Sequence, residues 1–122
     1  MADGINDSGQ VVGSWGNNTV HAFLYSNGTI TGLPEPSFAA GLGCEARAIN
    51  NNGQIAGICY DTSDNAHLVR WSNGMVTDLG TLNPPGEVAI AEALSINNNG
   101  QIVVNATDTA TGQTHALLLT PN

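Results

Sequence analysis

The chain has 122 residues and a formal net charge of -8, with ten acidic residues set against two arginines and no lysine. Such a charge repels a phosphate backbone and an anionic lipid surface, so no nucleic-acid partner is expected. No segment approaches the roughly 18 to 20 consecutive apolar residues that cross a bilayer, so no membrane insertion is expected either. An apolar content of 41% with 15 glycines and 5 prolines is typical of one turn-rich β domain.

A seven-residue word recurs three times along the chain. The central copy occupies residues 49–55, and related copies occupy residues 5–11 and 96–102. The period is 44 and then 47 residues, measured between the glutamines Gln10, Gln54 and Gln101. A period of this size is typical of solenoids and of four-stranded propeller blades. We therefore expect a repeat protein.

Each copy of the word contains an Asn-rich segment followed by Gly and Gln. Asn and Asp tolerate the left-handed region and bond to their own backbone, and Gly adopts positive φ freely, so the segment predicts a hairpin turn that reverses the chain. The glycines at these turns are Gly9, Gly53 and Gly100. A cation site is the alternative, because residues 6–9 distantly resemble a calcium loop, although the alternating acidic ligands and distal Glu of such loops are absent.

The first unit, residues 1–39, contains four predicted strands. They cover residues 2–5, 10–15, 20–25 and 29–33, and short polar turns join them. Pro34 and Pro36 end the last strand, because proline cannot donate to a sheet ladder. Residues 34–43 should therefore connect this unit to the next.

The second and third units, residues 40–87 and 88–122, follow the same plan. The predicted strands of the second unit are 44–49, 54–60, 66–71 and 75–80, and those of the third are 88–96, 101–107 and 114–119. The third unit has no predicted fourth strand. The whole chain thus has about eleven predicted strands and no evident helix.

Three words resemble the bacterial HAF extracellular repeat. They are residues 4–13, His21-Ala22-Phe23-Leu24-Tyr25, and residues 78–82. The resemblance covers almost the whole chain, although the second and third units depart from the His-Ala-Phe word. It implies propeller-like blades and an extracellular or cell-surface protein of a bacterium, with a signal peptide that is not in this chain. It implies no reaction.

His21, His67 and His115 occupy the same place in the three units, at the head of the third strand. In a propeller, equivalent positions lie on a wide ring and cannot meet at one metal, whereas in a three-fold trefoil they could. A structural role, with a ring nitrogen bonded to a neighbouring turn, is favoured over a metal site or surface binding. No metal or cofactor is expected, and burial would keep such a histidine neutral.

Cys44 and Cys59 flank the central turn. If Asn51 and Asn52 are the two central residues of that turn, the cysteines are cross-strand partners, and both positions become alanine in the third unit. A three-residue turn with a Gly bulge would instead put the sulfurs on opposite faces. A disulfide, which would indicate an oxidising compartment, and free buried thiols both remain open.

Aromatic and acidic residues near the loops are the candidate binding residues. Trp15 and Tyr60 end the second strands of their units, where an exposed ring could stack on a sugar, with core or rim packing as the alternative. Asp61 and Asp64 share one loop and offer a carboxylate pair for glycoside cleavage, with a solvated turn as the alternative. No nucleophile elbow is present.

These features predict three blade-like units of antiparallel strands, with a β-trefoil-like barrel as the alternative. A propeller needs about four to eight blades, and open ends expose unpaired strand edges, so we expect self-association, with a dimer closing a six-bladed ring favoured. The expected function is a non-catalytic binding or scaffold module. It would display loops 16–19, 61–65 and 109–113 to a glycan or protein ligand. The alternative is a polysaccharide hydrolase or lyase that uses loop carboxylates.

Overall fold

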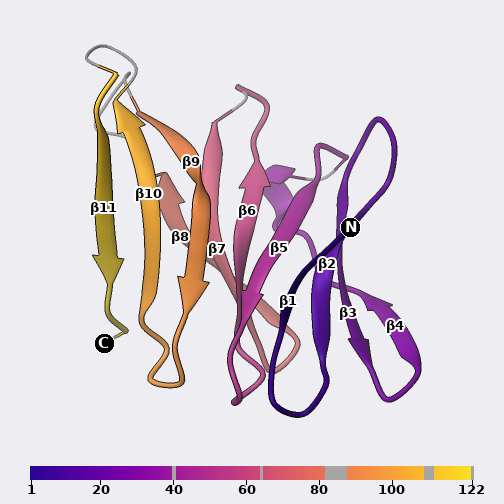
Figure 1. Cartoon of the computed structure of the whole chain (residues 1–122). Coiled ribbons are helices and arrows are strands. Elements are labelled where there is room, and N and C mark those ends of the chain that lie inside the picture. Colours follow the sequence, from indigo (N-terminus) through magenta and orange to yellow (C-terminus); the bar gives the residue numbers. More distant parts are fainter. Residues whose placement is uncertain (40, 64, 82–87, 109–111, 122) are drawn as a thin grey trace.

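The computed structural model describes residues 1–39, 41–63, 65–81, 88–108 and 112–121. These residues form eleven strands in three antiparallel sheets, together with one short 3-10 turn (Figure 1). The prediction of an all-β chain is confirmed. Within the described residues, none of the three sheets closes on itself.

The first sheet has the order β1-β2-β3-β4, with each strand paired to the next one along the chain. Its strands are β1 (Ala2–Ile5), β2 (Val11–Trp15), β3 (His21–Ser26) and β4 (Thr29–Gly32). The connector that follows contains the 3-10 turn η1 (Ser37–Ala39), where the sequence predicted no helical element. The indole Nε1 of Trp71 donates to the carbonyl oxygen of Pro34 at 2.7 Å, which ties the connector to the second sheet.

The second and third sheets repeat this order, as β5-β6-β7-β8 and β9-β10-β11. Their strands are β5 (Cys44–Ile49), β6 (Ile55–Tyr60), β7 (Ala66–Ser72), β8 (Met75–Thr81), β9 (Val88–Ile96), β10 (Ile102–Asp108) and β11 (Thr114–Leu119). Every strand boundary lies within one residue of the position predicted from the sequence. Alternating side chains and strong turn residues explain this agreement.

The three sheets lie side by side, and their first strands are neighbours (Figure 1). β5 contacts β1 on one side and β9 on the other. The Asn-rich turns β1–β2, β5–β6 and β9–β10 lie together at the lower end of Figure 1, and the β2–β3 and β6–β7 connections lie at the upper end. We call the three Asn-rich turns the corners: residues 6–10, 50–54 and 97–101.

Two apolar clusters hold neighbouring sheets together. Between the first and second sheets lie Val12, Ala22, Ala39, Cys44, Ala46, Ile49, Ile55, Cys59, Val69 and Trp71. Between the second and third sheets lie Ala56, Leu68, Ile96 and Ile102. Apolar burial is the main stabilising contribution to a fold, at about 25 cal/mol per Å², so the second sheet is stabilised on both faces.

The central corner is not the two-residue turn assumed from the sequence. The backbone N–H of Asn50 donates to Gln54 O at 3.0 Å, and that of Gly53 donates to Asn50 O at 3.2 Å. With Gly53 at a φ of 78°, this is a three-residue turn that ends in a glycine bulge. As a result Ile49 pairs with Ile55, one position away from the assumed register.

A second irregularity in β5 restores the register. It lies between Ala46 and Ala48, so Arg47 is an extra residue, and beyond it Cys44 pairs with Cys59. The turn is the three-residue alternative, which was expected to separate the sulfurs, but the two shifts cancel and the cysteines still face each other. β1 carries the equivalent irregularity between Ala2 and Gly4.

Candidate functional site

Each corner is capped by its own first asparagine. The Oδ1 of Asn50 accepts hydrogen bonds from the backbone N–H of Asn52 at 3.0 Å and of Gln54 at 2.9 Å, and its Nδ2 donates to Gln54 Oε1 at 2.7 Å. The other two corners repeat these bonds around Asn6 and Asn97. This geometry explains the repeated word, because the turn needs the first Asn, the Gly and the Gln.

The first asparagines also bond from one unit to the next. The Nδ2 of Asn6 donates to Asn50 O at 3.0 Å, and the Nδ2 of Asn50 donates to Asn97 O at 2.9 Å. Each bond therefore links a residue to its equivalent in the following unit. Asn6 and Asn50 are buried, with 9% and 3% of their surface exposed.

The second corner residues form a parallel row of bonds. The backbone N–H of Asp7 donates to Asn51 Oδ1 at 2.8 Å, and that of Asn51 donates to Asn98 Oδ1 at 2.9 Å. Asn51 Nδ2 also donates to Asp7 Oδ2 at 2.8 Å, and Asn52 Nδ2 donates to Asn98 O at 2.9 Å. We call these bonds between corners the corner ladder. The sequence pattern predicted only a local turn at each corner, and this linking role was missed.

The alternative of a cation site at the corners finds no support in the side chains. Asn6 is occupied with the turn and with Asn50, and Asp7 bonds to Asn51. Across the described residues, no group of three or more His, Cys, Asp or Glu side chains could hold a metal ion. The side chains of Asn6 and Asp7 therefore form the first turn and link it to the second unit.

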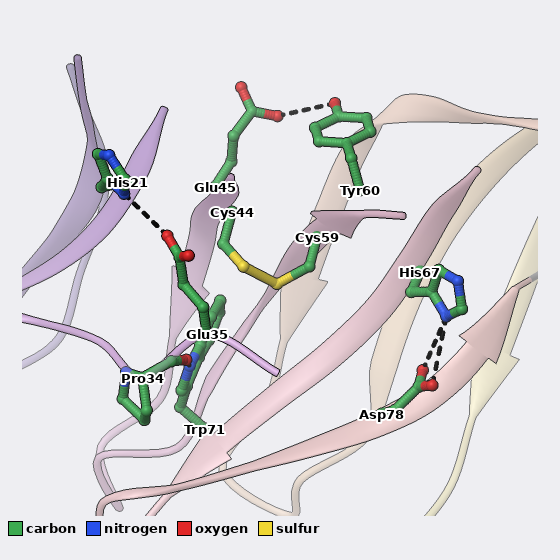
Figure 2. The surroundings of a disulfide bond; sticks show 10 residues. All are labelled: His21, Pro34, Glu35, Cys44, Glu45, Cys59, Tyr60, His67, Trp71 and Asp78. Carbon is green, nitrogen blue, oxygen red and sulfur yellow. Dashed lines mark hydrogen bonds and ion pairs between the residues drawn. A yellow bond between two sulfur atoms is a disulfide. The ribbon is translucent and has the colours of Figure 1, made fainter. Parts of the chain in front are cut away.

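Cys44 and Cys59 form a disulfide between β5 and β6, with a Cα–Cα distance of 4.1 Å (Figure 2). Both residues have 0% of their surface exposed, so the bond lies inside the core between the first two sheets. Cys59 is also the register partner of His67 on β7.

The His67 ring is held on three sides. Its Nε2 lies 2.8 Å from Asp61 Oδ2, its Nδ1 lies 3.2 Å from Asp78 Oδ1 (Figure 2), and Phe38 stacks on it with ring centroids 4.1 Å apart. Burial lowers the pKa of His67, but the hydrogen bonds that its ring donates to Asp61 and Asp78 outweigh burial and raise the pKa above its ordinary value of 6.5. The two carboxylates thus oppose the neutral state that burial alone would favour.

Asp61 organises the β6–β7 connection. Besides His67, its carboxylate accepts from the backbone N–H of Ser63 and of Asn65, each at 2.9 Å. The hydrogen bond with His67, followed by that with Asn65, lowers the pKa of Asp61 to about 2. The other predicted carboxylate, Asp64, lies outside the described residues.

The three histidines lie in three different sheets. The Nδ1 of His21 on β3 lies 2.8 Å from Glu35 Oε1 (Figure 2), and its ring lies 4.9 Å from that of Trp15. His115 on β11 is exposed and pairs with Ala106 in register. The structure therefore gives two of the histidines carboxylate partners, and the partners differ between the units.

The two predicted aromatic residues have different surroundings. Tyr60 is partly buried, and its hydroxyl donates to Glu45 Oε2 at 3.2 Å. Burial, and then Glu45, raise the pKa of Tyr60. Trp15 is 55% exposed at the end of β2. Only Trp15 of the two presents an open ring.

Aligning the units on their corners and histidines shows why Trp15 is exposed. The large exposed apolar residues of the first sheet occupy positions that are buried or half-buried in the second sheet. The pairs are Ile5 and Ile49, Trp15 and Cys59, Tyr25 and Trp71, and Ile30 and Val76. In the second sheet these positions pack against the first sheet. The first sheet therefore has an open face of the same apolar kind.

The third sheet has the opposite open face. Val103 is 47% exposed, whereas its equivalents Val12 and Ala56 are each 0% exposed between sheets. Leu118, the register partner of Val103, is 61% exposed, and its equivalent Leu24 packs against the first core cluster. Two apolar faces, on the first and third sheets, thus remain uncovered by the described residues.

No family model, curated protein or solved structure matches this chain. Among the described residues, no helix has the length and apolar character needed to cross a membrane. The open faces and the corners are therefore the features that bear on function.

Proposed function

We propose that this chain is a non-catalytic scaffold and binding module, of the HAF repeat type, that self-associates into a closed β-propeller of two copies. The observation that carries the proposal is the pair of open apolar faces. Each face occupies positions that are packed against a neighbouring sheet elsewhere in the same chain. A second copy would supply both missing neighbours. The third sheet of the second copy would cover the first sheet of this chain, and the first sheet of the second copy would cover the third sheet of this chain.

The large exposed fractions of apolar side chains on the first sheet favour packing against a second copy over contact with solvent. Ile5 and Ile30 are 69% and 67% exposed, and large exposed patches of apolar residues on a soluble protein mark association surfaces. Two identical junctions, one at each end, close a ring and leave no sheet face uncovered. Closure also protects the open strand edges that favour aggregation.

The proposed assembly changes the interpretation of Trp15. Its equivalent, Cys59, is fully buried between two sheets, so packing at the junction is favoured over stacking on a sugar. Ligand binding is then assigned to the upper rim of Figure 1, where the β2–β3 and β6–β7 connections lie. A buried disulfide accords with an exported protein, because disulfides persist in oxidising compartments.

The hydrolase alternative has weaker support. A carboxylate with a pKa of about 2 is a poor general base near neutral pH, and Asp61 already holds a turn and a histidine. A panel of polysaccharides incubated with the protein and with Asp61→Asn would reveal any activity that depends on this residue.

Light scattering tests the self-association directly. We expect a mass twice that of the 12.5 kDa chain, and a shift toward the single-chain mass in Ile30→Asp, because a charge replaces an apolar residue at the junction. Met75→Asp is the matched control, since Met75 is 71% exposed but its equivalent in the first unit, Thr29, is exposed as well. A single-chain mass for the unmodified protein, or equal effects of the two variants, contradicts the proposal.

A further inference from the structure

The third corner has the same turn as the other two but a different exposure. Asn97 Oδ1 accepts from the backbone N–H of Asn99 and of Gln101, each at 3.0 Å, as in the other corners. Asn6 and Asn50 are nevertheless buried, whereas Asn97 is exposed. The difference arises because no described residue lies beyond the third corner to continue the ladder.

Three donor hydrogens of the third corner have no acceptor among the described residues. The first is the second hydrogen on Asn97 Nδ2, because the other hydrogen of that group donates to Gln101 Oε1. The backbone N–H of Asn98 and the Nδ2 of Asn99 make no hydrogen bond in this part of the chain. At the second corner, the equivalent groups of Asn50, Asn51 and Asn52 all donate to the third corner.

The first corner presents the matching acceptors. Among the residues that the structure describes, the carbonyl oxygen of Asn6 accepts only from Gly9 N–H, whereas that of Asn50 accepts from Gly53 N–H and also from Asn6 Nδ2. Asp7 Oδ1 and the Asp7 carbonyl oxygen accept no hydrogen bond from the described residues. Their equivalents in the third corner, Asn98 Oδ1 and Asn98 O, each accept one from the second corner.

We propose that the third corner of one copy binds the first corner of a second copy and so continues the corner ladder across the junction. The three bonds run from Asn97 Nδ2 to Asn6 O, from the Asn98 N–H to Asp7 Oδ1, and from Asn99 Nδ2 to Asp7 O. This inference rests on the proposed self-association and deepens it. The apolar faces supply burial, and the ladder fixes which ends meet and in which register.

The direction of the ladder makes the junction head-to-tail. At both internal steps the Nδ2 of the first asparagine and the backbone N–H of the second corner residue donate toward the next corner along the chain, and the one bond in the opposite direction among the described residues runs from Asn51 Nδ2 to Asp7 Oδ2. Two third corners would therefore place donor against donor, and two first corners would place acceptor against acceptor. Only a third corner against a first corner satisfies both sides, and two copies can form this contact twice.

A charge exchange between positions 98 and 7 tests the contact. Asn98→Asp keeps the oxygen that accepts from Asn51 inside the chain, but it places a second carboxylate opposite Asp7 of the other copy. Because like charges that face each other across an interface are costly, we expect the dissociation constant of the dimer to rise about tenfold or more. Asp7→Asn alone recreates the Asn–Asn pairing of the internal step from Asn51 to Asn98, so it should change the dissociation constant by less than about threefold.

The double variant Asp7→Asn with Asn98→Asp should restore association. It puts a carboxylate opposite an amide, which is the arrangement that Asp7 and Asn51 already have inside the chain. Sedimentation velocity over a dilution series gives the dissociation constant of each variant, and circular dichroism confirms that each one is folded.

The possible results separate the two proposals. Loss of the dimer in Asn98→Asp with recovery in the double variant supports the corner contact. A dimer that Ile30→Asp disrupts but Asn98→Asp leaves unchanged overturns the corner contact and leaves the self-associating scaffold standing. An unmodified protein that stays a single chain at every concentration overturns both.

Discussion

Asn50 Nδ2 lies 2.9 Å from the carbonyl oxygen of Asn97, and Asn6 makes the same bond to Asn50 at 3.0 Å. The separations along the chain, 47 and 44 residues, equal the repeat period. The corners are thus both turns within a sheet and links between sheets.

Asn50→Asp should destabilise the fold. The change keeps an oxygen for the turn but removes a buried donor and sets a carboxylate against the Asn97 carbonyl, at a cost of about 1 to 3 kcal/mol. Urea unfolding at protein concentrations below those at which copies associate measures this cost. Asn97→Asp is the matched control, because Asn97 Nδ2 also donates to the Gln of its own turn but, among the described residues, makes no bond to a further corner. Equal losses in the two variants would show that the ladder does not stabilise the fold.

Gly57→Ala should be strongly destabilising. A Cβ at this position would clash with the backbone oxygen of Glu45 and lie 2.8 Å from the Trp71 ring, so β5 or the indole must move. Overpacking of this kind costs about 1 to 3 kcal/mol. Gly32→Ala is the control, since a Cβ there meets no atom within 4 Å and Gly32 does not have a positive φ. Thermal unfolding of both variants measures the difference, and similar midpoints would contradict the close approach of β5 and β6.

Replacing both cysteines by alanine should leave the fold intact but less stable. The disulfide closes a segment of 15 residues, for which loop-closure entropy gives about 3 kcal/mol. The third unit carries alanine at both equivalent positions and still pairs β9 with β10, although Ala106 there faces Ile90 rather than Ala91, so pairing of these strands does not require the bond. Urea unfolding of Cys44→Ala with Cys59→Ala measures the loss. An unfolded double variant would show that the disulfide is a condition for folding.

The His67 cluster should make stability depend on pH in a defined direction. The pKa of His67 is raised in the folded protein, so its contribution is fully present below about pH 6.5, its ordinary pKa, and is lost as the pH rises through the folded value. The pKa of Asp61 is lowered from 3.8 to about 2, so its contribution is present above pH 3.8 and is lost as the pH falls toward 2. The cluster therefore stabilises most between about pH 4 and 6.5.

Comparing melting temperatures of the protein and of His67→Gln across pH 4 to 9 tests this dependence. The difference between the two should be largest at about pH 5 to 6 and should shrink as the pH rises. His115→Gln is the control, because His115 is exposed and should show no such trend. A difference that grows with pH would contradict the assigned ion pairs with Asp61 and Asp78.

The strands were predictable because their signals are local. Alternating apolar residues, the Ser-Asn-Gly turns and the prolines placed every strand within one residue of its position. The type of the corner turn was not predictable, because Asn51-Asn52 and Asn51-Asn52-Gly53 are both acceptable turn sequences. Two compensating irregularities, one at Gly53 and one at Arg47, then decided the pairing of the cysteines.

The links between units could not be predicted in the same way. The ladder joins residues 44 and 47 positions apart, and its bonds depend on how the sheets stack. One signal was present, since the second and third corners keep three asparagines although the local turn bonds use only the first of them. The contact between Asp78 on β8 and His67 was missed for the same reason. The position of His67 at the head of its strand does not show which side chain of the neighbouring strand reaches its ring.

Sedimentation equilibrium of the unmodified chain over a wide concentration range tests the closed two-copy ring most directly. A closed ring of two copies should give a mass that rises to twice 12.5 kDa and then stays constant, because its two head-to-tail junctions leave no free corner. A mass of 12.5 kDa at every concentration, or one that keeps growing beyond two copies, would contradict it.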